Sequence, residues 1–460
     1  MTPLGHFDQK RLLTNNLNMS ATTHSQWGRP IDVYISDCGA SPNEQYHNSL
    51  PFNHEIEALQ AVQSITEVAG SQGDKVWKIV DTRTLESAHN LALDTETIRH
   101  LANPQLITSC IQLMKSIKPL GTVSPFSYEN GYLSFRILVN AINVCLLQRW
   151  DRLDIALRVG KRLDSNFKAA DFVSDMVDAT VGEKLGSLAF GGDCDSVLGW
   201  KPARDRNRFS PLLLQSEAST LLELLWKDRK HFLRVMRDAS LPGLSGLIFV
   251  AFRLVSQMGH NNSQFIEETP QAKLYELILR YLLVAPQTQG STLKLFLKQN
   301  IIAGPIWKNQ PAFVDPLDSR MILESFTRYY SKPTEWHSVE RPLVLFVFVR
   351  ASIDPQSQDL LPEVIRSAID YTWTMILEGH ANNDLLTFIQ CKIDTLYLLI
   401  KPTYYSNTWK PSTRSQILDV IRKQEFLDLV ARFILLLKPA ATTHAPEAGS
   451  QLKLISQHTI

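Results

Sequence analysis

The sequence predicts an all-α protein, and three observations carry this prediction. Apolar residues recur about every 3.6 residues along most of the chain, as they do on the buried face of an α-helix. Almost no segment alternates apolar and polar residues as a half-buried strand would. Prolines divide the later periodic segments into lengths typical of globular helices: Pro286, Pro305, Pro311, Pro316, Pro333, Pro355 and Pro402.

The first part of the chain predicts a polar arm followed by a helical block. Residues 1–50 are rich in Asn, Ser, Thr and His, and we expect a flexible arm with one short strand at 31–35, where apolar and polar residues alternate. The block at 51–185 follows, with Pro104 inside its second helix. Its expected helices are 55–69, 94–117, 132–149, 151–163 and 165–180.

A long loop is expected at 186–209. Four glycines lie from Gly186 to Gly199 and Pro202 follows, a composition that does not form a good helix. We expect this loop to divide the chain into the first block and a second helical block at 210–438. A flexible polar tail at 439–460 completes the predicted organisation.

The second block is predicted to begin with one long helix at 215–237, after the helix-start signal Ser210-Pro211. Leu241-Pro242-Gly243 then interrupts the periodic pattern. The further helices expected here are 244–257, 271–284, 291–300, 318–331, 341–351, 360–378, 383–400 and 413–437.

Helix spacing in this block suggests a repeat. Alternate helices start about 40–50 residues apart, for example from 244 to 291 and from 318 to 360, which is the period of HEAT and armadillo helix pairs. No repeated sequence signature accompanies this period. We therefore expect an irregular α-solenoid, with a compact irregular multi-helix domain as the alternative.

Composition excludes several classes of protein. The 460 residues include 44% apolar residues, and 47 Lys+Arg against 46 Asp+Glu give a formal charge of +1. These values argue against wholesale disorder and give no general reason to expect nucleic acid as a partner. The five cysteines are too far apart to form a paired zinc motif, and their odd number predicts reduced thiols and a cytoplasmic or nuclear protein.

No membrane span or secretory signal is expected. The most apolar runs, 244–252 and 343–349, are much shorter than the ~20 residues that cross a bilayer. The N-terminus has neither the basic segment nor the long apolar segment of a secretory signal.

No catalytic residue, cofactor or metal ligand is predicted. Asp171, Asp175 and Asp178 share one helix face at spacings of four and three residues. Helix-borne carboxylates hold magnesium on a diphosphate in all-α enzymes of the terpene-synthase kind, which makes such an enzyme the alternative. The adjacent aspartate pair of that motif is missing, so a solvated acidic face is the preferred interpretation.

Two groups of residues are candidates for binding a partner. The first is a basic run consisting of Lys201, Arg204, Arg206 and Arg208. It could contact an acidic protein, or nucleic acid through residues 201–208 as the weaker alternative. The second group consists of Trp226, Arg229, Lys230 and Arg234, all on the predicted long helix. Trp and Arg dominate protein–protein hot spots, although Trp226 could instead belong to the core.

Two short stretches carry a resemblance to known proteins. Residues 224–230 (Leu-Leu-Trp-Lys-Asp-Arg-Lys) and 242–246 (Pro-Gly-Leu-Ser-Gly) resemble helical segments of large fungal families that often carry a C-terminal MYND-type zinc finger. No cysteine follows Cys391, so the finger is absent from this sequence. The resemblance therefore implies an uncharacterised helical-repeat scaffold.

These observations together predict a non-enzymatic helical scaffold that binds another protein along a helical surface.

Overall fold

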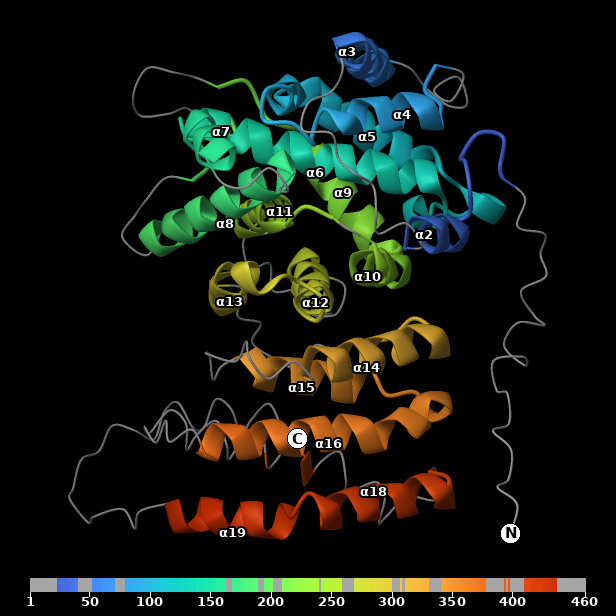
Figure 1. Ribbon diagram of the computed structural model, residues 1–460, viewed down its shortest axis with the longest axis vertical. Helices are drawn as coiled ribbons and strands as arrows, with labels where there is room; N and C mark the ends of the chain where they lie inside the picture. The colour runs from blue at the N-terminus through green and yellow to red at the C-terminus, as the bar shows by residue number, and fades with distance from the viewer. Residues whose placement is uncertain are drawn as a thin grey trace. The chain divides into compact units, whose positions relative to one another are not determined.

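The protein is all-α in the part of the chain that the structure describes. The computed structural model describes residues 23–39, 52–70, 79–162, 168–188, 194–201, 209–239, 241–258, 269–299, 307, 311–330, 341–377, 393, 396–397 and 409–436. Within these ranges no residue belongs to a β-strand, and the extended contacts are two isolated bridges, His24 with Gly28 and Pro30 with Tyr128. The expected fold class is therefore confirmed at the level of helical content (Figure 1).

The predicted strand at 31–35 is wrong, because helix α2 (Ile31–Gly39) occupies this segment. Ile31 and Tyr34 are buried, so this part of the expected arm belongs to the folded protein. The Arg29 guanidinium anchors it through two hydrogen bonds to the carboxylate of Glu129, at 2.7 and 3.1 Å. The rest of the expected arm, 1–22 and 40–50, lies outside the described residues.

Contacts divide the chain into two compact units. Unit 1 contains Met1–Thr180, Asp193–His231 and Asp238–Val250, and unit 2 contains Val181–Gly192, Phe232–Arg237 and Ala251–Ile460. The boundaries of these units differ from those of the predicted blocks, since Asp193–His231 and Asp238–Val250 group with unit 1 and the largest part of unit 2 begins at Ala251. Local sequence patterns do not predict this grouping, because it depends on contacts between residues that are far apart in the chain.

Unit 1 is built around helix α6 (Glu129–Arg149), which contacts α2, α4, α5 and α7. Other helices of this unit are α3 (Phe52–Glu67), α4 (Thr82–Asn90), α5 (Pro104–Ser116), α7 (Leu153–Arg162), α9 (Gln215–Lys227) and the first parts of α8 (Ala169–Leu188) and α11 (Ser245–Met258). By length and composition α6 could cross a membrane, but 94% of the relevant window is buried inside the protein. Such burial is what the central helix of a folded core shows.

The expected helix at 94–117 is instead a short 3-10 turn, Ile98–Leu101, followed by α5. Pro104 stands in the first turn of α5, where its missing N–H costs nothing, and Asn103 caps the helix by accepting from the backbone N–H of Gln105. The proline therefore starts a helix where the sequence pattern had placed it inside one.

Unit 2 contains helices that contact near neighbours in the chain. Its main helices are α12 (Pro270–Leu282), α13 (Gly290–Gln299), α14 (Pro316–Tyr330), α15 (Arg341–Ala351), α16 (Leu361–Leu377), α18 (Pro411–Lys423) and α19 (Phe426–Leu436). Helix α12 contacts α13 and α15, α14 contacts α15 and α16, α16 contacts α18 and α19, and α18 contacts α19 (Figure 1). Most of the helix expected at 383–400, and the whole tail at 439–460, lie outside the described residues.

Candidate protein-binding surface

The predicted long helix at 215–237 is wrong, because two helices, α9 and α10 (Arg229–Asp238), meet at Asp228. The side chain of Asp228 is buried and accepts three hydrogen bonds. Its Oδ2 accepts from the backbone N–H of Phe126 at 2.8 Å, and its Oδ1 lies 2.8 Å from Ser124 Oγ and 2.7 Å from His231 Nδ1. This carboxylate fixes the point at which the two helices join.

The predicted candidates Trp226 and Arg229 lie on either side of this junction and contact each other. The Arg229 guanidinium carbon lies 4.0 Å from the centre of the Trp226 ring, and its Nη1 donates to the Trp226 carbonyl at 3.3 Å. A cation over an indole face contributes about 0.5–1 kcal/mol at such a site. Both side chains are half-buried, so Trp226 is neither a core residue nor fully exposed.

The other two candidates of this group lie on α10. Lys230 and Arg234 are half-buried and four residues apart, so they share one face of the helix. Phe232, Leu233 and Val235 of the same helix are buried. The helix is therefore amphipathic, with its cations away from its buried side.

The basic run is described only at its first residue. Lys201 Nζ lies 2.8 Å from the buried carboxylate of Asp195, so this cation has a structural partner. Arg204, Arg206 and Arg208 lie outside the described residues. The prediction that they bind a partner therefore stays a prediction.

The two chain segments that flank this run are tied together by a set of hydrogen bonds that we call the clasp. Arg149 donates from Nη1 to the Val197 carbonyl at 2.7 Å and from Nη2 to the Ser210 carbonyl at 2.9 Å. The backbone N–H of Leu212 donates to the carbonyl of Leu198 at 2.9 Å. A further bond, at 2.8 Å, runs from Trp200 Nε1 to the Leu213 carbonyl. Residues 197–200 of the expected loop are thus held beside residues 210–213, which follow it.

Gly199 gives a direct test of the clasp. Its φ of +72° is strained for any L side chain, and a Cβ placed there would lie 2.6 Å from the Ser210 carbonyl oxygen. We expect Gly199→Ala to lower the free energy of unfolding by about 2–4 kcal/mol in urea denaturation. Gly121 is the matched control, since its φ is +82° but nothing lies within 4 Å of its added Cβ, so Gly121→Ala should cost only about 1 kcal/mol. Equal losses in the two variants would contradict the close approach at Gly199.

The three aspartates of the expected acidic face do not share one environment. Asp171 and Asp175 are exposed, whereas Asp178 is buried and accepts a hydrogen bond from Ser245 Oγ at 2.5 Å. Among the described residues no group of three or more His, Cys, Asp or Glu side chains is placed to hold a metal ion. The expectation of a fully solvated face is therefore wrong at Asp178, whose carboxylate ties α8 to α11 (Ser245–Met258).

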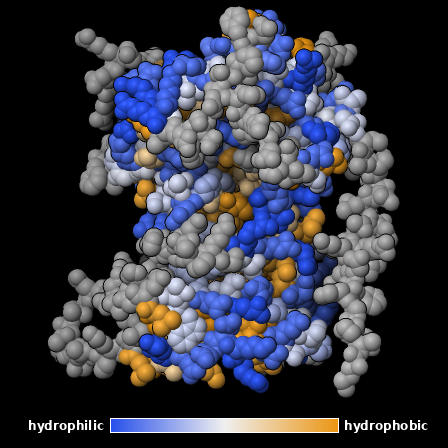
Figure 2. All heavy atoms as spheres, viewed as in Figure 1, coloured by the Kyte–Doolittle hydropathy of each residue, from blue (hydrophilic) through white to orange (hydrophobic). Residues whose placement is uncertain are grey.

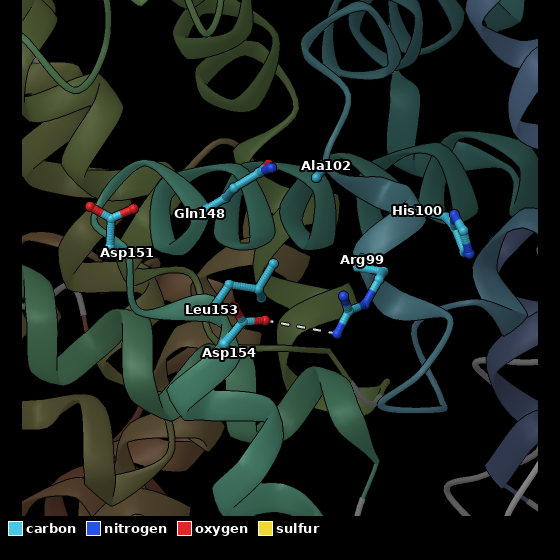
Figure 3. A pocket seen from close by; sticks show the side chains of 7 residues that line it. All are labelled: Arg99, His100, Ala102, Gln148, Asp151, Leu153 and Asp154. Carbon is cyan, nitrogen blue, oxygen red and sulfur yellow. Dashed lines mark ion pairs between the residues drawn. The ribbon is translucent and has the colours of Figure 1, made fainter. Parts of the chain in front are cut away.

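A surface pocket of about 440 Å³ in unit 1 was not anticipated from the sequence (Figure 3). Its lining residues are Arg99, His100, Ala102, Gln148, Asp151, Leu153 and Asp154. The Arg99 guanidinium lies 3.8 Å from the Asp154 carboxylate on one side of it. Arg99 belongs to the 3-10 turn Ile98–Leu101 and Asp154 to the first turn of α7, so only the fold brings these charges together. Most of its polar side chains are exposed to solvent, which makes it a shallow polar depression and not an enclosed substrate site.

The chain thus defines an all-α protein with a half-buried Trp–Arg pair at a helix junction. No protein-family model, no curated protein and no solved structure matches this chain.

Proposed function

We propose that the protein is a non-enzymatic helical scaffold that binds another protein along a helical surface. The observation that carries this proposal is the pattern of contacts in unit 2, where α12 contacts α13 and α15, α14 contacts α15 and α16, and α16, α18 and α19 contact one another. Helices whose contacts stay with near neighbours in the chain are typical of solenoids, which present long binding surfaces. We therefore propose an irregular solenoid of HEAT- or armadillo-like helix pairs for this unit, in line with the resemblance to helical-repeat scaffolds.

We propose that the partner contacts the surface around Trp226, Arg229, Lys230 and Arg234. The Trp226–Arg229 pair offers a flat, half-buried aromatic group beside a fixed cation, and these are residue types that carry binding energy in protein interfaces. The buried Asp228 holds the junction in place, so these side chains need little reordering on binding. An acidic surface on the partner would complement the cations.

A capture experiment with matched variants tests this function. The full-length protein, its R229E/R234E variant and the control K115E/K118E would each be used to capture proteins from cells of the source organism, followed by mass spectrometry. Lys115 and Lys118 are exposed, and the control reverses the same number of charges. We expect the test variant to retain roughly tenfold less of the specific partner than the control.

Two results would contradict the proposal. The first is equal capture of the same proteins by both variants. The second is a specific partner that is lost from the control alone. Thermal unfolding of each variant would separate loss of binding from loss of folding, and R204A/R206A/R208A would show separately whether the basic run contributes.

A further inference from the structure

The last described helix, α19, is apolar on nearly all sides. Of its 11 residues only Asp428 and Arg432 are charged. Leu429 and Phe433 are buried, on the side where α19 packs against α16 and α18. A helix that is apolar all round is normally a buried helix. Its remaining apolar residues therefore require an explanation.

Four of these remaining residues are exposed and form one stripe on the helix, which we call the α19 stripe: Leu427, Ala431, Ile434 and Leu435. The side chains of Leu427, Ile434 and Leu435 are 77%, 58% and 84% exposed. Ala431 is also exposed. It lies four residues from both Leu427 and Leu435 and three from Ile434, and residues three or four apart share a helix face. Ala431 is therefore at the centre of the stripe, both along the helix axis and around it. Figure 2 shows apolar side chains exposed in the region that α18 and α19 occupy in Figure 1.

We propose that the α19 stripe binds the same stripe of a second copy of this chain, with the two helices antiparallel about a two-fold axis at Ala431. This inference is independent of the proposed partner binding, since it uses no residue of the surface around Trp226, Arg229, Lys230 and Arg234. Ala431 is the smallest residue of the stripe and lies where two helix axes would approach most closely.

The two charges of α19 favour this occupant and this orientation. Asp428 and Arg432 are four residues apart and border the stripe on the same edge, next to Leu435. A two-fold axis between antiparallel helices places the same edge of both helices on the same side. At about 1.5 Å per residue, centring on Ala431 brings each Asp428 to within about 3 Å, along the axis, of the level of the other copy's Arg432. By the same arithmetic the two Arg432 side chains also differ by about 3 Å in level, but Arg432 lies about 40° further round the helix from the stripe than Asp428. The Asp428–Arg432 pairs are therefore the closer ones, and parallel packing would separate these charges.

A single helix stripe offers a small interface, so we expect a weak dimer. Sedimentation-velocity ultracentrifugation of the full-length protein over about 1–200 µM should show a reversible monomer–dimer equilibrium. Leu435→Glu should weaken dimerisation by roughly tenfold or more, because it places a charge in the stripe. Leu418→Glu is the control, since Leu418 is an apolar α18 residue that is 47% exposed and not part of the stripe.

Charge exchange tests the antiparallel orientation. Asp428→Arg alone and Arg432→Asp alone should each weaken the dimer, because each places like charges together, and the double exchange D428R/R432D should restore it. Ala431→Cys should form a disulfide between two copies on mild oxidation, whereas Ser415→Cys, an exposed position on α18, should not.

Several outcomes would overturn the proposal. A protein that is monomeric throughout the concentration range would mean that the stripe has another occupant. A dimer that survives Leu435→Glu would use a different surface. Failure of the double exchange to restore a dimer that each single exchange weakens would exclude the antiparallel arrangement. Circular dichroism of each variant would verify that α19 remains folded.

Discussion

Replacing Arg280 with Met should destabilise unit 2 by about 3–5 kcal/mol. Arg280 is fully buried on α12, and its guanidinium binds the fully buried carboxylate of Asp318 on α14 through two bonds of 2.7 and 2.9 Å. It also donates from Nε to Glu276 at 3.2 Å and from Nη2 to the Ala312 carbonyl at 2.8 Å. The two carboxylates raise the pKa of Arg280 against the opposing effect of burial, which is the largest influence on it. Without the guanidinium, two buried negative charges would face each other with no cation between them.

The measurement is the urea midpoint, together with hydrogen exchange of the α12 and α14 amides. Arg320→Met is a matched control on α14. Arg320 also makes two hydrogen bonds to one carboxylate, Asp359, at 2.8 and 3.1 Å, but both side chains are partly exposed. A solvent-exposed pair of this kind contributes about 0–1 kcal/mol. If Arg280→Met and Arg320→Met lower the free energy of unfolding by the same amount, burial does not explain the contribution of the Arg280 network to stability.

A rescue variant distinguishes the loss of the Arg280 ion pairs from the cost of leaving two buried carboxylates without a cation. Combining Arg280→Met with Glu276→Gln and Asp318→Asn removes both buried charges, so part of the lost stability should return. No recovery would mean that the hydrogen-bond geometry matters more than the charge. The bond from Trp307 Nε1 to Glu276 at 2.9 Å would persist in the triple variant, since a glutamine oxygen also accepts it.

Helical periodicity predicted the fold class because it is a local property of the chain. Most expected helices are present with bounds close to those predicted, including α13 and α15. The error at α2 came from five alternating residues, a length too short to separate the two periods. Pro30 directly before α2 and Asp32 in its first turn were the better signals, since both favour a helix start.

The candidate surface was predicted by residue type but not by geometry. Trp226 and Arg229 contact each other across the junction at Asp228, whereas the periodic pattern runs through Asp228 without interruption. The break there depends on Ser124 and Phe126, about a hundred positions earlier in the chain. Local sequence patterns do not predict hydrogen bonds between residues so far apart. The pocket at Arg99 and the clasp could not be predicted for the same reason.

Asp228→Ala should therefore be one of the most damaging single changes in unit 1, with an expected loss of about 2–4 kcal/mol in the free energy of unfolding. Removing the carboxylate leaves the N–H of Phe126 without its acceptor and releases Ser124 and His231 at the same time. Hydrogen bonds to a charged acceptor contribute more than neutral ones, and a buried donor left without a partner adds its own cost. Urea denaturation measures the loss, and hydrogen exchange at 124–128 localises it.

Asp228→Asn tests how much of the stability loss comes from the negative charge of the side chain, because Asn keeps nearly the same size and one acceptor oxygen. Its oxygen can still accept from Phe126, while its amide group must turn toward Ser124 and His231, so we expect a loss between those of wild type and Asp228→Ala. Asp154→Ala is the control, since this carboxylate is 79% exposed and its pair with Arg99 is long, at 3.8 Å; it should change stability by less than about 0.5 kcal/mol. An Asp228→Ala protein as stable as this control would show that the helix junction does not need the carboxylate. If the junction does need it, the variant should also bind the proposed partner more weakly than its remaining folded fraction explains, because Trp226 and Arg229 are positioned by the residue between them.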